Sequence, residues 1–181
     1  MKRPAFHLTA TALLTALLIA GSFVRIPLPG GIPLTLQVFF ALLGPALLGV
    51  RGALPALLYG ILGLAGLPVF SGGGGPGYVV SPTFGYIAGF VLGGALAGAL
   101  YPRTKTLPCG FLALAAGLGV IYLTGGAWLY WVKNIYTEGD FPVSLVIKYG
   151  VLPFLPLDLF KAAGVLWAAR RIRPVLYGSN R

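Results

Sequence analysis

The stretch CGFLALAAGLGVIYLTGGAWLY, residues 109–130, contains no aspartate, glutamate, lysine or arginine. A helix needs about 20 mostly apolar residues to cross the roughly 30 Å hydrocarbon core of a bilayer. This stretch has the required length and composition, so it predicts a membrane-spanning helix. Similar apolar runs occur throughout the chain, and their number and order determine the fold.

The composition of the whole chain agrees with this prediction. Of the 181 residues, 57% are hydrophobic and 9% are charged, and the mean hydropathy is +0.90. Soluble domains carry about 25% charged residues, so the chain is predicted to be an integral membrane protein. The net charge of +10 does not indicate a nucleic acid partner, because the basic residues stand singly or in small clusters between apolar runs.

Six apolar runs are close to the length of a membrane span. We predict an all-α integral membrane protein, a bundle of six transmembrane helices that forms a single domain over residues 1–181. The expected spans are residues 7–23, 34–50, 54–67, 83–101, 109–130 and 157–172, of which the third is short. The first run follows two basic residues, as in a secretory signal, but five more spans follow it, so we interpret it as an uncleaved helix. The segment VSLVIKYG, before the last span, is expected to form a short helix in the membrane interface.

The basic residues predict the orientation of this bundle. With a cytoplasmic amino terminus, nine of the 13 basic residues face the cytoplasm and only Arg25 and Lys133 lie in outer loops, while Lys148 and Lys161 are close to or inside the last span. Because lysine and arginine are enriched on the cytoplasmic side, both termini are predicted to be cytoplasmic. The nine residues are Lys2, Arg3, Arg51, Arg103, Lys105, Arg170, Arg171, Arg173 and Arg181.

A glycine-rich segment, VFSGGGGPGYVVSPTFGY at residues 69–86, interrupts the apolar pattern. A Walker-type phosphate loop requires a lysine after its last glycine, and no lysine occurs between Arg51 and Lys105. The chain therefore cannot be its own P-loop ATPase. Two alternatives remain, a flexible linker or a compact outer loop whose glycines allow a close backbone approach to a ligand.

Polar residues within the apolar sequence are the strongest candidates for a site, because charge at membrane depth is costly. Asp158 and Lys161 are three residues apart, which places them on one face of a helix. They either form an internal ion pair or offer an acceptor and a cation to one polar ligand. Gln37, at the outer start of the second span, either caps backbone groups or contacts the same ligand.

The sequence offers little for catalysis or metal binding. The single cysteine, Cys109, has no partner for a disulfide or a zinc-type cluster. An intramembrane enzyme could use Asp158 and Lys161 as acid and base, but it would lack a second acid, a histidine cluster and an activated nucleophile. We therefore expect no catalytic residue, no metal site and no enzyme. A passive channel is also disfavoured, because one charged pair provides no polar path across the bilayer.

Four motifs, in this order, carry a resemblance to a known family. They are IPLPGGIPLTLQ, YGILGLAGLPVFSGGGGPG, SPTFGY and LPFLPLDLFKA, and they extend over residues 26–162. Together they resemble the BioY family, the substrate-capture (S) components of energy-coupling-factor vitamin transporters, which bind biotin. The resemblance covers most of the chain, and the combination is specific although each glycine or proline cluster alone is not.

The resemblance implies a function and a set of site residues. The chain is expected to capture biotin, its transported substrate and not a cofactor, in the cell membrane of a prokaryote, without hydrolysing ATP. Asp158 and Lys161 are expected to bind the ligand, with Thr83, Tyr86 and Gln37 as further contacts. The implied partners are a transmembrane coupling protein and two cytoplasmic ATPases, besides membrane lipid. An S component for another vitamin or small carboxylate remains the alternative.

A stripe of small residues lies in the first span, where Ala12, Ala16 and Ala20 recur every four residues. This spacing stacks three small side chains on one helix face and allows another helix to approach closely. From spacing alone, the stripe either packs inside this protein or docks another membrane subunit. The resemblance to the BioY family favours docking on the coupling protein.

Overall fold

The computed structural model describes residues 4–28, 32–137 and 139–177. Helices account for most of these residues, and two-residue strands β1 and β2 form a small antiparallel sheet that the all-α prediction did not include. The basic residues Lys2, Arg3 and Arg181, used to predict the orientation, lie outside the described ranges. The elements are α1 Pro4–Phe23, β1 Arg25–Ile26, β2 Leu34–Thr35, α2 Gln37–Leu48, η1 Gly49–Ala53, α3 Leu54–Leu64, η2 Pro76–Val80, α4 Phe84–Leu100, η3 Tyr101–Arg103, α5 Leu107–Trp131, η4 Val132–Tyr136, α6 Val143–Gly150 and α7 Leu155–Tyr177.

Four helical segments of the described chain are long and apolar enough to cross a membrane. A fifth is added if α6 and α7, which are bent by 50° at their junction, count as one span. The four segments are Ala5–Phe23, Gln37–Leu64, Phe84–Arg103 and Leu107–Tyr136. The molecule is thus a mostly helical, multi-span bundle, and the count of six spans stays a prediction.

The segment Gln37–Leu64 is a helical hairpin. Nε2 of Gln37, at the start of α2, lies 2.6 Å from the hydroxyl oxygen of Tyr59 in α3. On a continuous helix these residues would be about 33 Å apart, so the chain reverses between them. The reversal occurs in η1, which begins at Gly49 with a φ of 66°. The helices end at Leu48 and Leu64, a few residues before the ends predicted for the second and third spans.

Glycines allow the helices to pack closely. A Cβ atom on Gly93 of α4 would overlap the main-chain oxygen of Gly117 of α5. In the same way, a Cβ atom on Gly52 would overlap the backbone of Gly44, which holds η1 against α2. Such backbone contacts between helices are typical of membrane bundles. The hydrophobic effect does not drive helices together in lipid, so they associate through the close packing that small residues allow.

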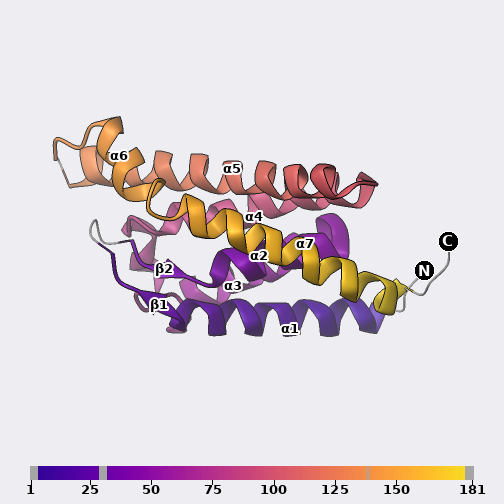
Figure 1. The fold of residues 1–181 in the computed structure, drawn as a ribbon. Coiled ribbons are helices and arrows are strands. Elements are labelled where there is room, and N and C mark those ends of the chain that lie inside the picture. The colour runs from indigo at the N-terminus through magenta and orange to yellow at the C-terminus, as the bar shows by residue number, and fades with distance from the viewer. Residues whose placement is uncertain (1–3, 29–31, 138, 178–181) are drawn as a thin grey trace.

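The bundle has two distinct ends (Figure 1). α1 begins and α7 ends at one of them, which we call the terminal end, where the hydroxyl of Tyr177 donates a 3.0 Å hydrogen bond to the oxygen of Leu47. The other, which we call the hairpin end, carries the two strands and α6. α1 and α5 lie on opposite sides of the molecule (Figure 1). The strand β2, at the hairpin end, contributes Leu34 and Thr35 to the cavity described below.

Candidate functional site

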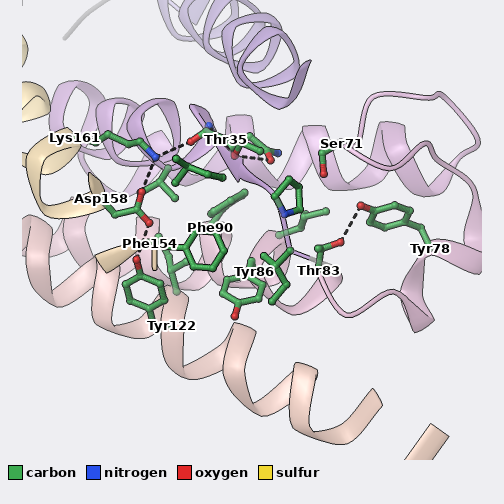
Figure 2. Close-up of a pocket in the computed structure, with 17 residues that line it drawn as sticks. Thr35, Ser71, Tyr78, Thr83, Tyr86, Phe90, Tyr122, Phe154, Asp158 and Lys161 are labelled. Carbon is green, nitrogen blue, oxygen red and sulfur yellow. Dashed lines mark hydrogen bonds and ion pairs between the residues drawn. The ribbon is translucent and has the colours of Figure 1, made fainter. Parts of the chain in front are cut away.

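A cavity lies among β2, α2, α4, α5 and the start of α7 (Figure 2). It encloses about 560 Å³ of atom-free space, including the space at its opening to solvent. Small-molecule sites commonly have mainly apolar walls with a few polar groups, and this cavity has that character. The five predicted ligand contacts, from three different segments of the chain, all line this cavity; they are Gln37, Thr83, Tyr86, Asp158 and Lys161.

The first of the polar groups is the pair of Asp158 and Lys161 on α7. Nζ of Lys161 lies 2.6 Å from Oδ1 of Asp158, and their side chains are 12% and 4% exposed, respectively. Pro156 and Asp158 lie in the first turn of α7. Proline is tolerated there because N–H groups of the first turn have no partner within the helix, and the helix dipole favours an acidic side chain at this end. The prediction of one shared helix face near the start of this helix is confirmed.

Two further groups hold this pair in place. The hydroxyl of Tyr122, on α5, donates a 2.7 Å hydrogen bond to Oδ2 of Asp158. Nζ of Lys161 donates a 2.7 Å hydrogen bond to the main-chain oxygen of Thr35 in β2. The pair is therefore an internal ion pair and also part of the cavity wall, so the two alternatives drawn from the sequence do not exclude each other.

Gln37 lines the cavity with its side-chain amide already bonded to neighbours. Its side chain is buried, Nε2 donates to the hydroxyl of Tyr59 at 2.6 Å, and Oε1 accepts from the hydroxyl of Thr35 at 3.1 Å. The amide thus joins α2, α3 and β2 beside the cavity. A ligand could accept only from its remaining N–H, because the other donor is committed to Tyr59.

Thr83 and Tyr86 lie where the glycine-rich segment enters α4. The hydroxyl of Thr83 is 2.9 Å from the hydroxyls of Tyr78 and Ser81, and the hydroxyl of Tyr86 donates to the oxygen of Gly150 at 2.8 Å. With its hydroxyl bonded to the backbone, Tyr86 presents its ring to the cavity (Figure 2). Its ring would overlap a Cβ atom on residue 125, a glycine of α5.

A second cavity adjoins the first, and we call it the vestibule. It encloses about 1,370 Å³ including open solvent, and it shares Pro33, Ser71, Tyr78 and Thr83 with the inner cavity. The remaining lining residues are Arg25, Pro27, Leu28, Gly72, Gly74, Gly77, Val80 and Ser81. The shared residues lie at the junction of the two cavities.

The glycine-rich segment forms much of the vestibule wall and is a compact loop. The N–H of Gly75 donates a 2.7 Å hydrogen bond to the oxygen of Gly63, and Phe70 and Gly73 exchange two backbone hydrogen bonds. Gly73 and Gly75 have φ angles of 122° and 104°, which side-chain-bearing residues rarely adopt. The segment is therefore compact and not a flexible linker, whereas its position on the outer side and its approach to a ligand stay predictions.

Several lining residues were not found from the sequence. Thr35 contributes a backbone oxygen, which any residue carries, and Tyr122 is one of nine tyrosines with no local feature that separates it from the others. Phe90 and Phe154 add aromatic wall (Figure 2). Thr35 does lie within the motif PLTLQ, two residues before Gln37. Its closeness to a predicted ligand contact was the sequence signal that could have placed it at the site.

The stripe of Ala12, Ala16 and Ala20 lies on the exposed face of α1, away from the cavity. Because these side chains are exposed, packing inside this protein does not explain their spacing. Docking of another subunit remains a prediction. Within the residues that the structure describes, no three histidine, cysteine, aspartate or glutamate side chains gather closely enough to hold a metal ion.

Known proteins resemble this chain in sequence and in fold. A family model described as the BioY family matches residues 1–178. A "Biotin transporter BioY" of Thermotoga maritima is 36% identical over 169 residues, which cover 92% of this chain and 95% of the relative. A "Biotin transporter BioY" of Rhodobacter capsulatus is 39% identical over 180 residues, covering 92% of each chain. A crystal structure of the S-component for biotin from an ECF-type ABC transporter superposes with a TM-score of 0.83 at 26% identity, covering 96% of this chain and 94% of that one.

Proposed function

The chain belongs to the BioY family, and on this premise we propose that it captures biotin in the cavity that Asp158 and Lys161 line. Biotin uptake as an S component is the function that its relatives and the solved biotin S-component support. The structural observation that carries the proposal is a buried ion pair at the wall of an apolar cavity that opens into a vestibule.

The chemistry of biotin matches the groups that this cavity presents. Its ureido ring has two N–H donors and one carbonyl acceptor, its thiophane ring is apolar, and its valerate chain ends in a carboxylate. Each oxygen of Asp158 accepts one hydrogen bond in the structure and retains a lone pair for a ureido N–H. Lys161 has three N–H donors and uses two, so one is left for an oxygen of the ligand.

Apolar and aromatic side chains would enclose the rest of the ligand. Tyr86, Phe90 and Phe154 present rings to the cavity, and Thr83 lies at its junction with the vestibule. Under this proposal Gln37 contacts the ligand through its remaining amide N–H while its other groups fix the wall. A related vitamin or small carboxylate is the alternative substrate, since small differences in such a wall decide specificity.

We further propose six membrane crossings, with both termini cytoplasmic, in the plasma membrane of a prokaryote. The reversal at η1 supports two crossings by α2 and α3, although each helix is shorter than the roughly 20 residues that span a bilayer. The meeting of the start of α1 and the end of α7 at one end supports termini on the same side (Figure 1). The guanidinium of Arg173 lies 5.6 Å from the ring of Tyr101 near this end, in keeping with a cytoplasmic surface rich in basic residues.

Under this proposal the chain works with a transmembrane coupling protein and two cytoplasmic ATPases, surrounded by membrane lipid. The exposed stripe of Ala12, Ala16 and Ala20 is the proposed contact for the coupling protein, because small side chains allow close helix approach. This division of labour agrees with the lack of a Walker motif around the glycine-rich segment.

Direct binding of labelled biotin to the purified chain tests the function. We expect saturable binding without ATP, with competition by unlabelled biotin and none by an unrelated vitamin such as thiamine. A folded chain that binds no biotin, or binds thiamine equally well, would contradict the substrate.

A further inference from the structure

The vestibule contains one charged residue among those that line it, Arg25. Resting on the proposed function, we propose that Arg25 is the subsite for the carboxylate of the captured ligand. Its side chain is exposed, and the ion pair found in the described chain joins two other residues, Lys161 and Asp158. The guanidinium therefore carries a positive charge that no described carboxylate neutralises.

The backbone of Arg25 is fixed close to the buried ion pair. Arg25 pairs with Thr35 across the two-stranded sheet, and the oxygen of Thr35 accepts the hydrogen bond from Nζ of Lys161. Residues paired across antiparallel strands have Cα atoms about 4.5–5.5 Å apart. The sheet thus places Arg25 beside the strand residue that closes the inner cavity.

The side chain of Arg25 reaches the junction between the two cavities. Its Nη1 donates a hydrogen bond to the main-chain oxygen of Ser71, and Ser71 lines both the inner cavity and the vestibule. A guanidinium has five N–H donors, so four remain after this contact, enough for a two-point contact with a carboxylate. An anionic group that emerges from the inner cavity at this junction would meet Arg25.

Charge balance favours this orientation of the ligand. The positive charge of Lys161 is already matched by Asp158 at 2.6 Å, so the inner cavity holds a neutral pair. A neutral ureido ring suits that pair, whereas an anion there would face Asp158 as well as Lys161. The ligand would therefore enter ring first, with its carboxylate at Arg25.

A competing explanation is that Arg25 only ties β1 to the glycine-rich segment through Ser71. The two explanations differ in their dependence on the ligand's charge. We therefore propose measuring dissociation constants for biotin and for biotin methyl ester, which lacks the anionic charge. The chains compared are the wild type, Arg25→Gln, Arg25→Lys and the control Lys148→Gln, which removes an exposed cation of α6 that lines neither cavity.

The wild type is expected to bind biotin at least about tenfold more tightly than the ester, the lower limit for a hydrogen bond to a charged group. Arg25→Gln keeps an N–H donor for Ser71 and should lose about this factor for biotin while its affinity for the ester is unchanged. Arg25→Lys keeps the charge but cannot make the two-point contact, so its affinity for biotin should lie between those of the wild type and Arg25→Gln. The affinities of Lys148→Gln should match those of the wild type.

Equal losses for acid and ester in Arg25→Gln would overturn the subsite and leave Arg25 a structural tie. Equal binding of acid and ester by the wild type would overturn it even if the variant failed to fold. A wild type that binds neither compound would instead contradict the proposed biotin capture, and the subsite with it.

Discussion

Nζ of Lys161 lies 2.6 Å from Oδ1 of Asp158, one turn apart on α7, and the same nitrogen lies 2.7 Å from the oxygen of Thr35. One ammonium therefore joins α7 to the sheet that borders the cavity. Because both side chains are nearly enclosed, the carboxylate and the ammonium depend on each other for neutralisation. Substitutions here should affect both stability and binding, and the two effects can be separated.

Asp158→Asn should weaken biotin binding at least about tenfold, because the ureido N–H groups lose a charged acceptor. The variant also leaves Lys161 without its carboxylate, and breaking a buried ion pair costs about 3–5 kcal/mol of stability. Dissociation constants for labelled biotin and thermal unfolding, measured on the same preparation, report the two losses. Binding at the wild-type affinity would exclude Asp158 as a ligand contact.

The double substitution Asp158→Asn with Lys161→Met removes both charges and leaves neither unpaired. Replacing a whole buried pair is often neutral or stabilising, so the double variant should melt at a higher temperature than Asp158→Asn. It should still not bind biotin. Recovery of biotin affinity along with stability would mean that the pair serves only the fold.

Tyr122→Phe removes the hydroxyl that donates to Oδ2 of Asp158 and keeps the ring that lines the cavity. We expect a several-fold loss of biotin affinity, since the carboxylate loses the bond that fixes its orientation. Tyr130→Phe is the matched control on the same helix, because Tyr130 is exposed and outside the cavity. Equal affinities of the two variants would argue against an orienting role.

Gly74→Ala and Gly77→Ala compare two glycines of the vestibule wall. A Cβ atom on Gly74 would overlap the oxygen of Leu67, whereas one on Gly77 would have no neighbour within 4 Å. Gly74→Ala should therefore destabilise the fold by about 1–3 kcal/mol and weaken biotin binding, and Gly77→Ala should do neither. Similar melting temperatures for the two variants would contradict the close packing of this loop.

Ala16→Trp should leave biotin binding by the purified chain unchanged and abolish ATP-dependent uptake in cells that carry the coupling module. The indole would separate the helices that the small side chain lets approach. Leu123→Trp is the control, because Leu123 is 74% exposed on α5, on the opposite side of the bundle (Figure 1). Normal uptake by a well-expressed Ala16→Trp variant would count against docking at this stripe.

The helices were predictable because long uncharged runs coincide with them. The fifth predicted span, residues 109–130, corresponds to α5 Leu107–Trp131. Thr106 caps the start of this helix, because its side-chain oxygen accepts a 3.4 Å hydrogen bond from the N–H of Cys109. The α2 and α3 hairpin was harder to delimit, since its turn, η1, is itself helical and Arg51 is its single charged residue. The two-residue strands have too few residues for any periodic pattern.

The site was predictable where charge stands out against an apolar background. Asp158 and Lys161 could be assigned to one helix face from their spacing alone, and the structure confirms their contact. Tyr122 and the oxygen of Thr35 could not be found, because their role depends on which segments the fold brings together. Arg25 was placed in an outer loop from the sequence, but its position at the vestibule depends on pairing with Thr35.

A structure of the chain with biotin bound tests the central claim most directly. We expect the ureido ring in the inner cavity, with a ring nitrogen within about 3.2 Å of a carboxylate oxygen of Asp158, and the valerate chain directed toward the vestibule. Biotin bound outside this cavity, or bound within it with no contact to Asp158 or Lys161, would contradict the claim.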